Sequence, residues 1–271
     1  MVLRVCYKNI AIIFNNLIAL CSTLIIESPD LSNYKKWWEG EDIYIFKELV
    51  FIGLKSLDFL SFEFFYYSII IISTSLITSS IFAITQSSQQ TILIFLLIPF
   101  LAINSGITIR QNLALAFFLY TYNKKSALFS IFFHYSVLPA LIIRSRAFLF
   151  VLLLLSIVLI QYFTQQLEII FEFINGKADI YANNRESNYL RVIFSVAFYI
   201  YIYWKCRRLN LGKEIMIILL SLILSAINPQ LQRFGWFLIP IVIGKVLEKS
   251  SIKTRSICYL FMLTNFLMFF V

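Results

Sequence analysis

The chain has 271 residues, of which 60% are hydrophobic and 14% are charged, and its formal net charge is +9. Soluble domains carry about 25% charged residues, so this composition excludes an ordinary soluble domain and indicates a polytopic membrane protein. Each transmembrane helix needs about 20 mostly apolar residues. The length therefore predicts one integral membrane domain over residues 1–271, an all-α transmembrane bundle of roughly eight to ten helices.

The positive charge is arranged as short basic stretches between apolar runs. This is the pattern of cytoplasmic loops in membrane proteins, so we expect no nucleic-acid partner. The cysteines lie in or beside apolar segments without metal-like spacing, which predicts neither a disulfide framework nor a metal site. No phosphate-binding glycine loop or serine nucleophile motif is present in the sequence, and we expect no cofactor.

The N-terminal segment is predicted to be an uncleaved anchor with its N-terminus inside. Arg4 and Lys8 precede an apolar run over about residues 10–26, and no small-residue cleavage site follows it. The polar segment 27–47, which contains several carboxylates and a tryptophan pair, would then face outward as the lip of a site or as an interfacial aromatic belt. Residues 43–60 place charges among apolar positions and predict an amphipathic surface helix.

Residues 62–84 form a long apolar run that predicts a transmembrane helix. The next apolar stretch, residues 91–103, is too short to cross comfortably, and the string NSG at 104–106 interrupts it before another run at 107–122. Two interpretations fit. Either two short helices meet at an outward-facing turn that carries Arg110, or one discontinuous helix crosses the membrane once.

The sequence after this break places two ionisable side chains in strongly apolar surroundings. A charge at membrane depth costs roughly 2.5–3.5 kcal/mol on insertion scales, so Arg110 is a candidate functional residue that needs an anionic partner. His134 is the chain's only histidine and can exchange a proton near neutral pH. Packing roles are also open, because Gln111 beside Arg110 can join helices and a lone histidine is often a hydrogen-bonded core residue.

Charge counting determines the later topology only in part. The basic loop at 205–213 is predicted to be cytoplasmic, which places Arg233 and the polar segment 161–189 outside. That polar segment is long enough to cover an external site, or it is a solvated connector. Membrane crossings counted forward from the N-terminus give the same orientation for this basic loop only if residues 91–122 cross once or if the stretch around His134 is re-entrant.

Three motifs carry a resemblance to a known family. The central one joins GITIRQ at 106–111, an apolar helix, a lysine pair at 124–125 and FHYSVL at 133–138. The outer two are SPDLSNYKKWW at 28–38 and RFGWF at 233–237. Together they resemble the EpsG family of exopolysaccharide polymerases, relatives of the Wzy O-antigen and capsule polymerases. The similarity is weaker outside the central motif. Where the family usually has Gly-Thr-Asp, this chain has Ser-Pro-Asp at 28–30.

The resemblance implies a fold similar to type C glycosyltransferases. It also implies an enzyme of the bacterial inner membrane that joins oligosaccharide repeat units, each carried on a polyprenyl diphosphate, at the outer face. These lipid-linked units would be donor and acceptor, and a chain-length regulator is a possible partner. Arg110 and Arg233 would bind the diphosphate in place of a metal, through guanidinium forks. His134 would act as the base toward the acceptor hydroxyl or position the diphosphate. The substrate-binding residues would be Gln111, Asp30 and Tyr34.

Two other functions remain open at this point. A membrane-bound acyltransferase also centres on an intramembrane histidine, and would modify a surface polysaccharide without needing Arg233. A lipid-linked sugar transporter would hold a diphosphate with an intramembrane arginine, although 271 residues are few for alternating access by two repeats.

Overall fold

The described residues of the chain are helical, which confirms the all-α class for this part of the molecule, and no β-strand occurs among them. The predicted amphipathic helix over 43–60 and the polar segment 161–189 lie almost entirely outside the described residues. The computed structural model describes residues 2–25, 29–40, 53–54, 60–103, 108–122, 124–142, 189–225 and 232–268.

The chain divides into two compact units. Unit 1 comprises Met1–Val137 and Ile239–Val271, and unit 2 comprises Leu138–Leu238. Each unit has its own packing, and the single integral membrane domain expected over residues 1–271 remains a prediction.

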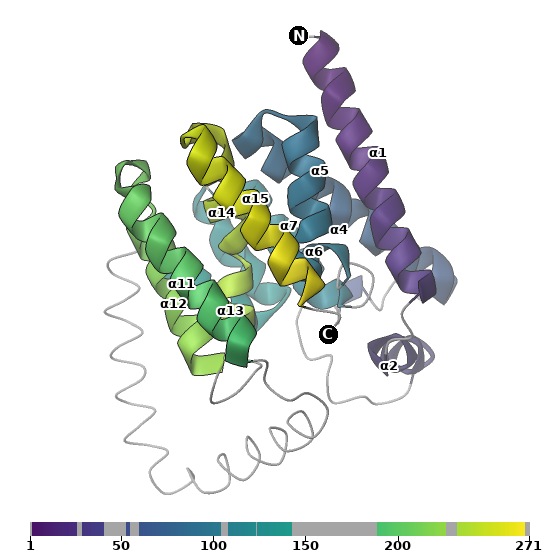
Figure 1. Ribbon diagram of the computed structural model, residues 1–271. Coiled ribbons are helices and arrows are strands. Elements are labelled where there is room, and N and C mark those ends of the chain that lie inside the picture. The colour runs from purple at the N-terminus through teal and green to yellow at the C-terminus, as the bar shows by residue number, and fades with distance from the viewer. Residues whose placement is uncertain are drawn as a thin grey trace, which may run out of the picture. The chain divides into compact units, whose positions relative to one another are not determined.

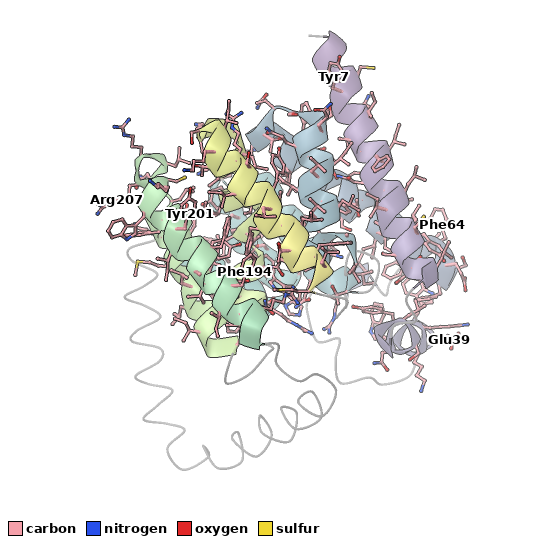
Figure 2. All side chains as sticks on the ribbon, viewed as in Figure 1. Tyr7, Glu39, Phe64, Phe194, Tyr201 and Arg207 are labelled. Atoms are coloured by element: carbon pink, nitrogen blue, oxygen red, sulfur yellow. The ribbon has the colours of Figure 1, made fainter. Side chains whose placement is uncertain are left out.

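Unit 1 is built on two long antiparallel helices, α1 (Val2–Ile25) and α4 (Phe62–Thr85). Tyr7 near the start of α1 and Phe64 near the start of α4 lie at opposite ends of the pair (Figure 2). Within the described part of the chain these are the two helices that are long and apolar enough to cross a membrane. The 24 residues of α4 span about 36 Å, more than the roughly 30 Å of a bilayer core. The helix predicted over 62–84 is thereby confirmed.

Polar side chains join α1 to α4 near the middle of both helices. Asn15 Nδ2 donates to Thr78 Oγ1 at 3.1 Å, and Asn16 Nδ2 donates to Ser75 Oγ at 3.0 Å. We call these four residues the α1–α4 clamp. Such interhelical hydrogen bonds hold apolar helices together where the hydrophobic effect between them is weak.

A short helix, α2 (Pro29–Trp38), occupies part of the segment expected to be an outward loop. Its aromatic side chains pack onto the first turns of α4. The Trp38 ring stacks on Phe65 with centroids 4.1 Å apart, and Trp38 Nε1 donates to the Leu60 carbonyl at 3.3 Å. The tryptophans predicted as an interfacial belt are therefore buried against the protein.

The apolar stretch after α4 breaks earlier than the sequence analysis expects. Helix α5 (Ser88–Leu97) ends before Ile98, which is extended at φ −93° and ψ 106°, and α6 (Pro99–Ala102) follows. The physical reason is that the Pro99 ring disfavours helical backbone at the residue before it. After residues outside the described part, α7 (Ile109–Thr121) begins.

The start of α5 and the end of α7 lie at the same end of unit 1. Ser88 Oγ donates to the Tyr7 carbonyl near the start of α1 at 2.7 Å. At the other end of this segment, Lys245 Nζ lies 6.0 Å from the Tyr122 ring centroid. Lys245 belongs to α14 (Ile239–Lys249), where a Cβ on the adjacent Gly244 would lie 3.0 Å from Ile84 at the end of α4. The two short helical stretches of the first interpretation therefore begin and end at one end of unit 1.

The chain then folds back along α7 without forming an α-helix. It makes the 3₁₀ helices η2 (Lys125–Phe132) and η3 (Tyr135–Val137), with His134 between them. The Phe133 ring meets Phe117 of α7 with centroids 5.2 Å apart. Helix α15 (Ile252–Leu267) completes unit 1 beside α14 and α5 (Figure 1).

Unit 2 contains a helical hairpin of α11 (Tyr189–Lys205) and α12 (Gly212–Ser225), which lie side by side (Figure 1). The turn between them holds the 3₁₀ helix η4 (Arg207–Leu209), and Arg207 lies at that end of the hairpin in Figure 2. Asn210 closes the turn in the left-handed region at φ 51°.

Two short helices of unit 2, α8 (Leu138–Ile142) and α13 (Arg233–Trp236), pack on α12 and on each other. The apolar run over 234–244 is divided between two helices. The turn at Phe237 and Leu238 separates α13 from α14, and the two helices belong to different units.

Candidate functional site

The first turn of α7 presents Arg110 and Gln111 side by side in the sequence. Arg110 is half-buried, and it starts a helix whose initial N–H groups have no intrahelical acceptor. A guanidinium and a helix N-terminus both favour a negative charge. The 13 residues of α7 span about 20 Å, so a membrane core of about 30 Å would enclose this N-terminus when Tyr122 lies at its surface.

Gln111 is the most unusual polar residue of unit 1. Its side chain is 6% exposed, and neither Nε2 nor Oε1 has a hydrogen-bond partner among the described residues. Leaving a buried donor or acceptor without a partner costs about 1–3 kcal/mol for each group. A polar group that is not part of the described protein would remove this cost, so Gln111 indicates a ligand more directly than any other residue of the site.

His134 is buried in the turn between η2 and η3, with 6% of its surface exposed. The backbone N–H of Ser136 donates to His134 Nδ1 at 3.1 Å, and Ser136 Oγ lies 2.7 Å from the same nitrogen. The sequence analysis did not assign a role to Ser136. The His-x-Ser spacing could have identified Ser136, because a turn of this kind brings residue i+2 back to the side chain of residue i.

The packing of η2 and η3 on α7 brings His134 into the same unit as Arg110 and Gln111. Phe133 directly precedes His134 and contacts Phe117. Phe117 lies two turns beyond Arg110, about 10 Å along the axis of α7. The residues of the central motif therefore lie on α7 and on the 3₁₀ segment that packs against it, and we call four of them the α7 site: Arg110, Gln111, His134 and Ser136.

The early motif lies in unit 1 as well, and of its two predicted substrate-binding residues only Tyr34 has a described side chain. Tyr34 is 3% exposed, and its ring lies 6.4 Å from that of Tyr66 on α4. It anchors α2 and does not present an open surface to a sugar. Asp30 lies in the first turn of α2, and its side chain is outside the described residues.

Arg233 belongs to unit 2. It is half-buried in the four-residue helix α13, with Cζ 5.9 Å from the centroid of the Trp236 ring. Gly235 allows α13 to approach α12, because a Cβ there would collide with the Ser221 hydroxyl. The Arg-x-Gly-Trp spacing thus has two local functions, a cation–π contact and a close helix crossing.

Cationic side chains and tyrosines occur together at the C-terminal end of α7. Lys124 Nζ lies 5.7 Å from the Tyr120 ring centroid, and Lys245 covers Tyr122. Amphipathic lysines and tyrosines of this kind are typical of a membrane–water interface. The two ends of α7 therefore differ, with lysines at one end and the Arg110–Gln111 pair at the other.

Within the described residues, no group of three or more His, Cys, Asp or Glu side chains is placed to hold a metal ion. No family model, no curated protein and no solved structure matches this chain. Its function has to be inferred from the α7 site and from the sequence motifs.

Proposed function

We propose that this chain is a membrane glycosyltransferase, a polysaccharide polymerase similar to the EpsG and Wzy families. It joins polyprenyl-diphosphate-linked oligosaccharide repeat units at the outer face of a bacterial inner membrane. Its complete fold is a multi-pass bundle of roughly eight to ten helices. Lipid-linked oligosaccharides are both donor and acceptor, and a chain-length regulator is a possible protein partner.

The observation that carries this proposal is the composition of the α7 site. An arginine and a buried glutamine without a described partner occupy the start of a short helix, and the only histidine of the chain packs on that helix. A substrate for this site has to offer a negative charge and several hydrogen-bonding groups, and it has to enter from apolar surroundings. A diphosphate that joins a sugar to a polyprenyl chain satisfies all three requirements.

Each residue of the site then has a chemical role. The Arg110 guanidinium binds diphosphate oxygens in a fork and stabilises the charge that develops on the leaving group. Gln111 donates to and accepts from the first sugar or the diphosphate, which satisfies both ends of its amide. Arg233 is the proposed second diphosphate ligand, and Asp30 is the proposed residue of the sugar side.

This chemistry uses arginine where many glycosyltransferases use a metal. We therefore expect the purified protein to polymerise lipid-linked repeat units in the presence of a chelator. Loss of product in the chelator and specific recovery with magnesium or manganese would contradict metal independence, and would direct attention to the carboxylates of residues 27–47.

Mass spectrometry of lipid-linked glycans from a deletion strain tests the function. Loss of a polymerase leaves single repeat units on the lipid at the outer face. An acyltransferase, which also uses an intramembrane histidine, would leave full-length chains that lack acyl groups. A transporter would leave repeat units on the cytoplasmic face. Either of the last two results would replace the polymerase proposal.

The orientation can be tested independently with alkaline phosphatase fusions. A fusion after Lys213 should be inactive, and a fusion after Pro229 should be active, because the basic loop at 205–213 is expected to be cytoplasmic. The reverse result would place Arg233 on the side away from the proposed substrate.

A further inference from the structure

Two groups of Ser136 face one nitrogen of His134. The Ser136 backbone N–H donates to Nδ1 at 3.1 Å, and Ser136 Oγ lies 2.7 Å from Nδ1. A backbone N–H can only donate, so Nδ1 has to present its lone pair. The hydroxyl of Ser136 can donate to the same lone pair. His134 and Ser136 are both buried, with 6% and 2% of their surfaces exposed, which shields this contact from competition by water.

The protonation state of the ring follows from this contact. A neutral imidazole carries its proton on one nitrogen, so a lone pair at Nδ1 places the proton at Nε2. In the imidazolium both nitrogens are donors, and Nδ1–H would then face the N–H of Ser136. The lone pair of His134 is therefore engaged by Ser136 and is not offered to a substrate while the turn is intact.

We propose that Ser136 is a positioning residue that holds His134 as a neutral Nε2–H donor, and that His134 serves polymerisation by hydrogen bonding to the diphosphate and not as the general base. This inference rests on the proposed function for its substrate. It decides between the two roles that the sequence left open for His134. A neutral donor adds a directed hydrogen bond to the diphosphate without adding a further cation to the proposed Arg110 and Arg233.

The group-transfer step balances without an imidazole base. The acceptor hydroxyl oxygen forms a bond to the anomeric carbon of the donor sugar. The bond between that carbon and the diphosphate oxygen breaks, and its electron pair leaves with the diphosphate. The proton of the acceptor hydroxyl passes to an oxygen of the departing diphosphate. In this proposal the Arg110 guanidinium and His134 Nε2–H each hydrogen-bond to the diphosphate and stabilise the charge that it gains.

Nuclear magnetic resonance tests the proton position directly, because His134 is the only histidine of the chain. The full-length protein, carried on an affinity tag without histidine and labelled with ¹⁵N-histidine, gives signals from one ring. We expect a pyridine-type signal from Nδ1 and a pyrrole-type signal from Nε2. A protonated Nδ1, in either the other tautomer or the imidazolium, would overturn the proposal.

The Ser136→Ala variant tests the positioning role in the same spectrum. It removes the hydroxyl and keeps the backbone N–H, so we expect the population of the Nδ1–H tautomer to rise. This readout reports the position of the proton and not the packing of the turn. An unchanged tautomer ratio in a folded Ser136→Ala protein would remove the Ser136 hydroxyl from this role.

Two substitutions of His134 separate a donor from a base in the polymerisation assay. Gln keeps an N–H donor and cannot take up a proton, whereas Glu is a base and repels a diphosphate. We expect His134→Gln to keep at least a tenth of the activity and His134→Glu to be inactive at matched protein levels. The opposite order would establish His134 as the base. If wild-type protein makes no polymer, the proposed function fails while the resonance result for His134 still stands.

Discussion

The α1–α4 clamp and the α7 site contain similar side chains in similarly apolar sequence, yet the structure uses them differently. In the clamp, each asparagine donates through its amide nitrogen to a hydroxyl on the facing helix, Asn15 to Thr78 and Asn16 to Ser75, while its Oδ1 has no partner among the described residues. In the α7 site, Gln111 is nearly as buried, and neither end of its amide has a partner among the described residues. The carboxamide thus joins two helices through its nitrogen in one place, whereas in the other both of its ends have no described partner.

This difference teaches how to interpret polar residues in an apolar helix. A hydrogen bond to a neighbouring helix stabilises assembly, and its average contribution in a membrane is about 0.6 kcal/mol. A buried group without a partner lowers stability, so its retention indicates a function that compensates for the loss. Substitutions in the two regions should therefore separate activity from stability in opposite ways.

The largest effect is expected from Arg110. Replacement by Ala should lower polymerisation about 100-fold or more, because two charge-assisted hydrogen bonds of about 1.5–3 kcal/mol each are lost. Replacement by Lys should be almost as damaging, since an ammonium lacks the fork geometry. Product length in membranes matched for protein level measures both variants. Near-normal product from Arg110→Lys would mean that the arginine only anchors a helix end at the interface.

Gln111→Leu should lower activity about tenfold, because one or two hydrogen bonds of about 1 kcal/mol to the substrate are lost. Its free energy of unfolding should stay the same or rise, since Leu removes two buried polar atoms that have no described partner. Assays of polymerisation and of unfolding in mixed micelles measure the two quantities. A clear loss of stability at full specific activity would reassign Gln111 to helix packing.

Asn15→Leu should have the reverse profile. The free energy of unfolding should fall by about 0.6–1.7 kcal/mol, because Thr78 loses its interhelical partner, and activity per folded protein should remain. The matched control is the double variant Asn15→Leu with Thr78→Val. Removing both partners should restore most of the stability. Lost specific activity in the double variant would show that the clamp has a function beyond assembly.

Thr74→Val is expected to have the smallest effect. Thr74 lies on α4 near the clamp, is fully buried, and its hydroxyl has no hydrogen-bond partner among the described residues. Valine has almost the same shape, so stability should be unchanged or increase by up to about 1 kcal/mol, with normal activity. If Thr74→Val abolishes polymerisation, the Thr74 hydroxyl binds a ligand as well. The contrast between the clamp and the α7 site would then disappear.

Residue composition and periodicity were sufficient for the broad class of the protein and for the long helix over 62–84, because a run of apolar residues longer than a bilayer is a local property. The charge pattern also singled out Arg110 and His134. The break at Ile98 was readable in principle, since the effect of Pro99 on the preceding residue is local too. The division of 234–244 was readable in the same way, because Pro240 in the first turn of α14 lacks the N–H that a continuous helix would need there.

Contacts between distant segments were decided by the tertiary structure. A hydropathy scale gives a carboxamide the same value whether or not it has a hydrogen-bond partner. The different roles of Asn15, which bonds to Thr78, and Gln111 could therefore not be predicted. The return of residues 88–122 to one end of unit 1 depends on contacts with Tyr7 and Lys245, which are far away in the chain. The tautomer of His134 depends on the turn that brings Ser136 to Nδ1. The sequence determines which groups are present, whereas the packing decides which partner each group meets, and the function follows from those partners.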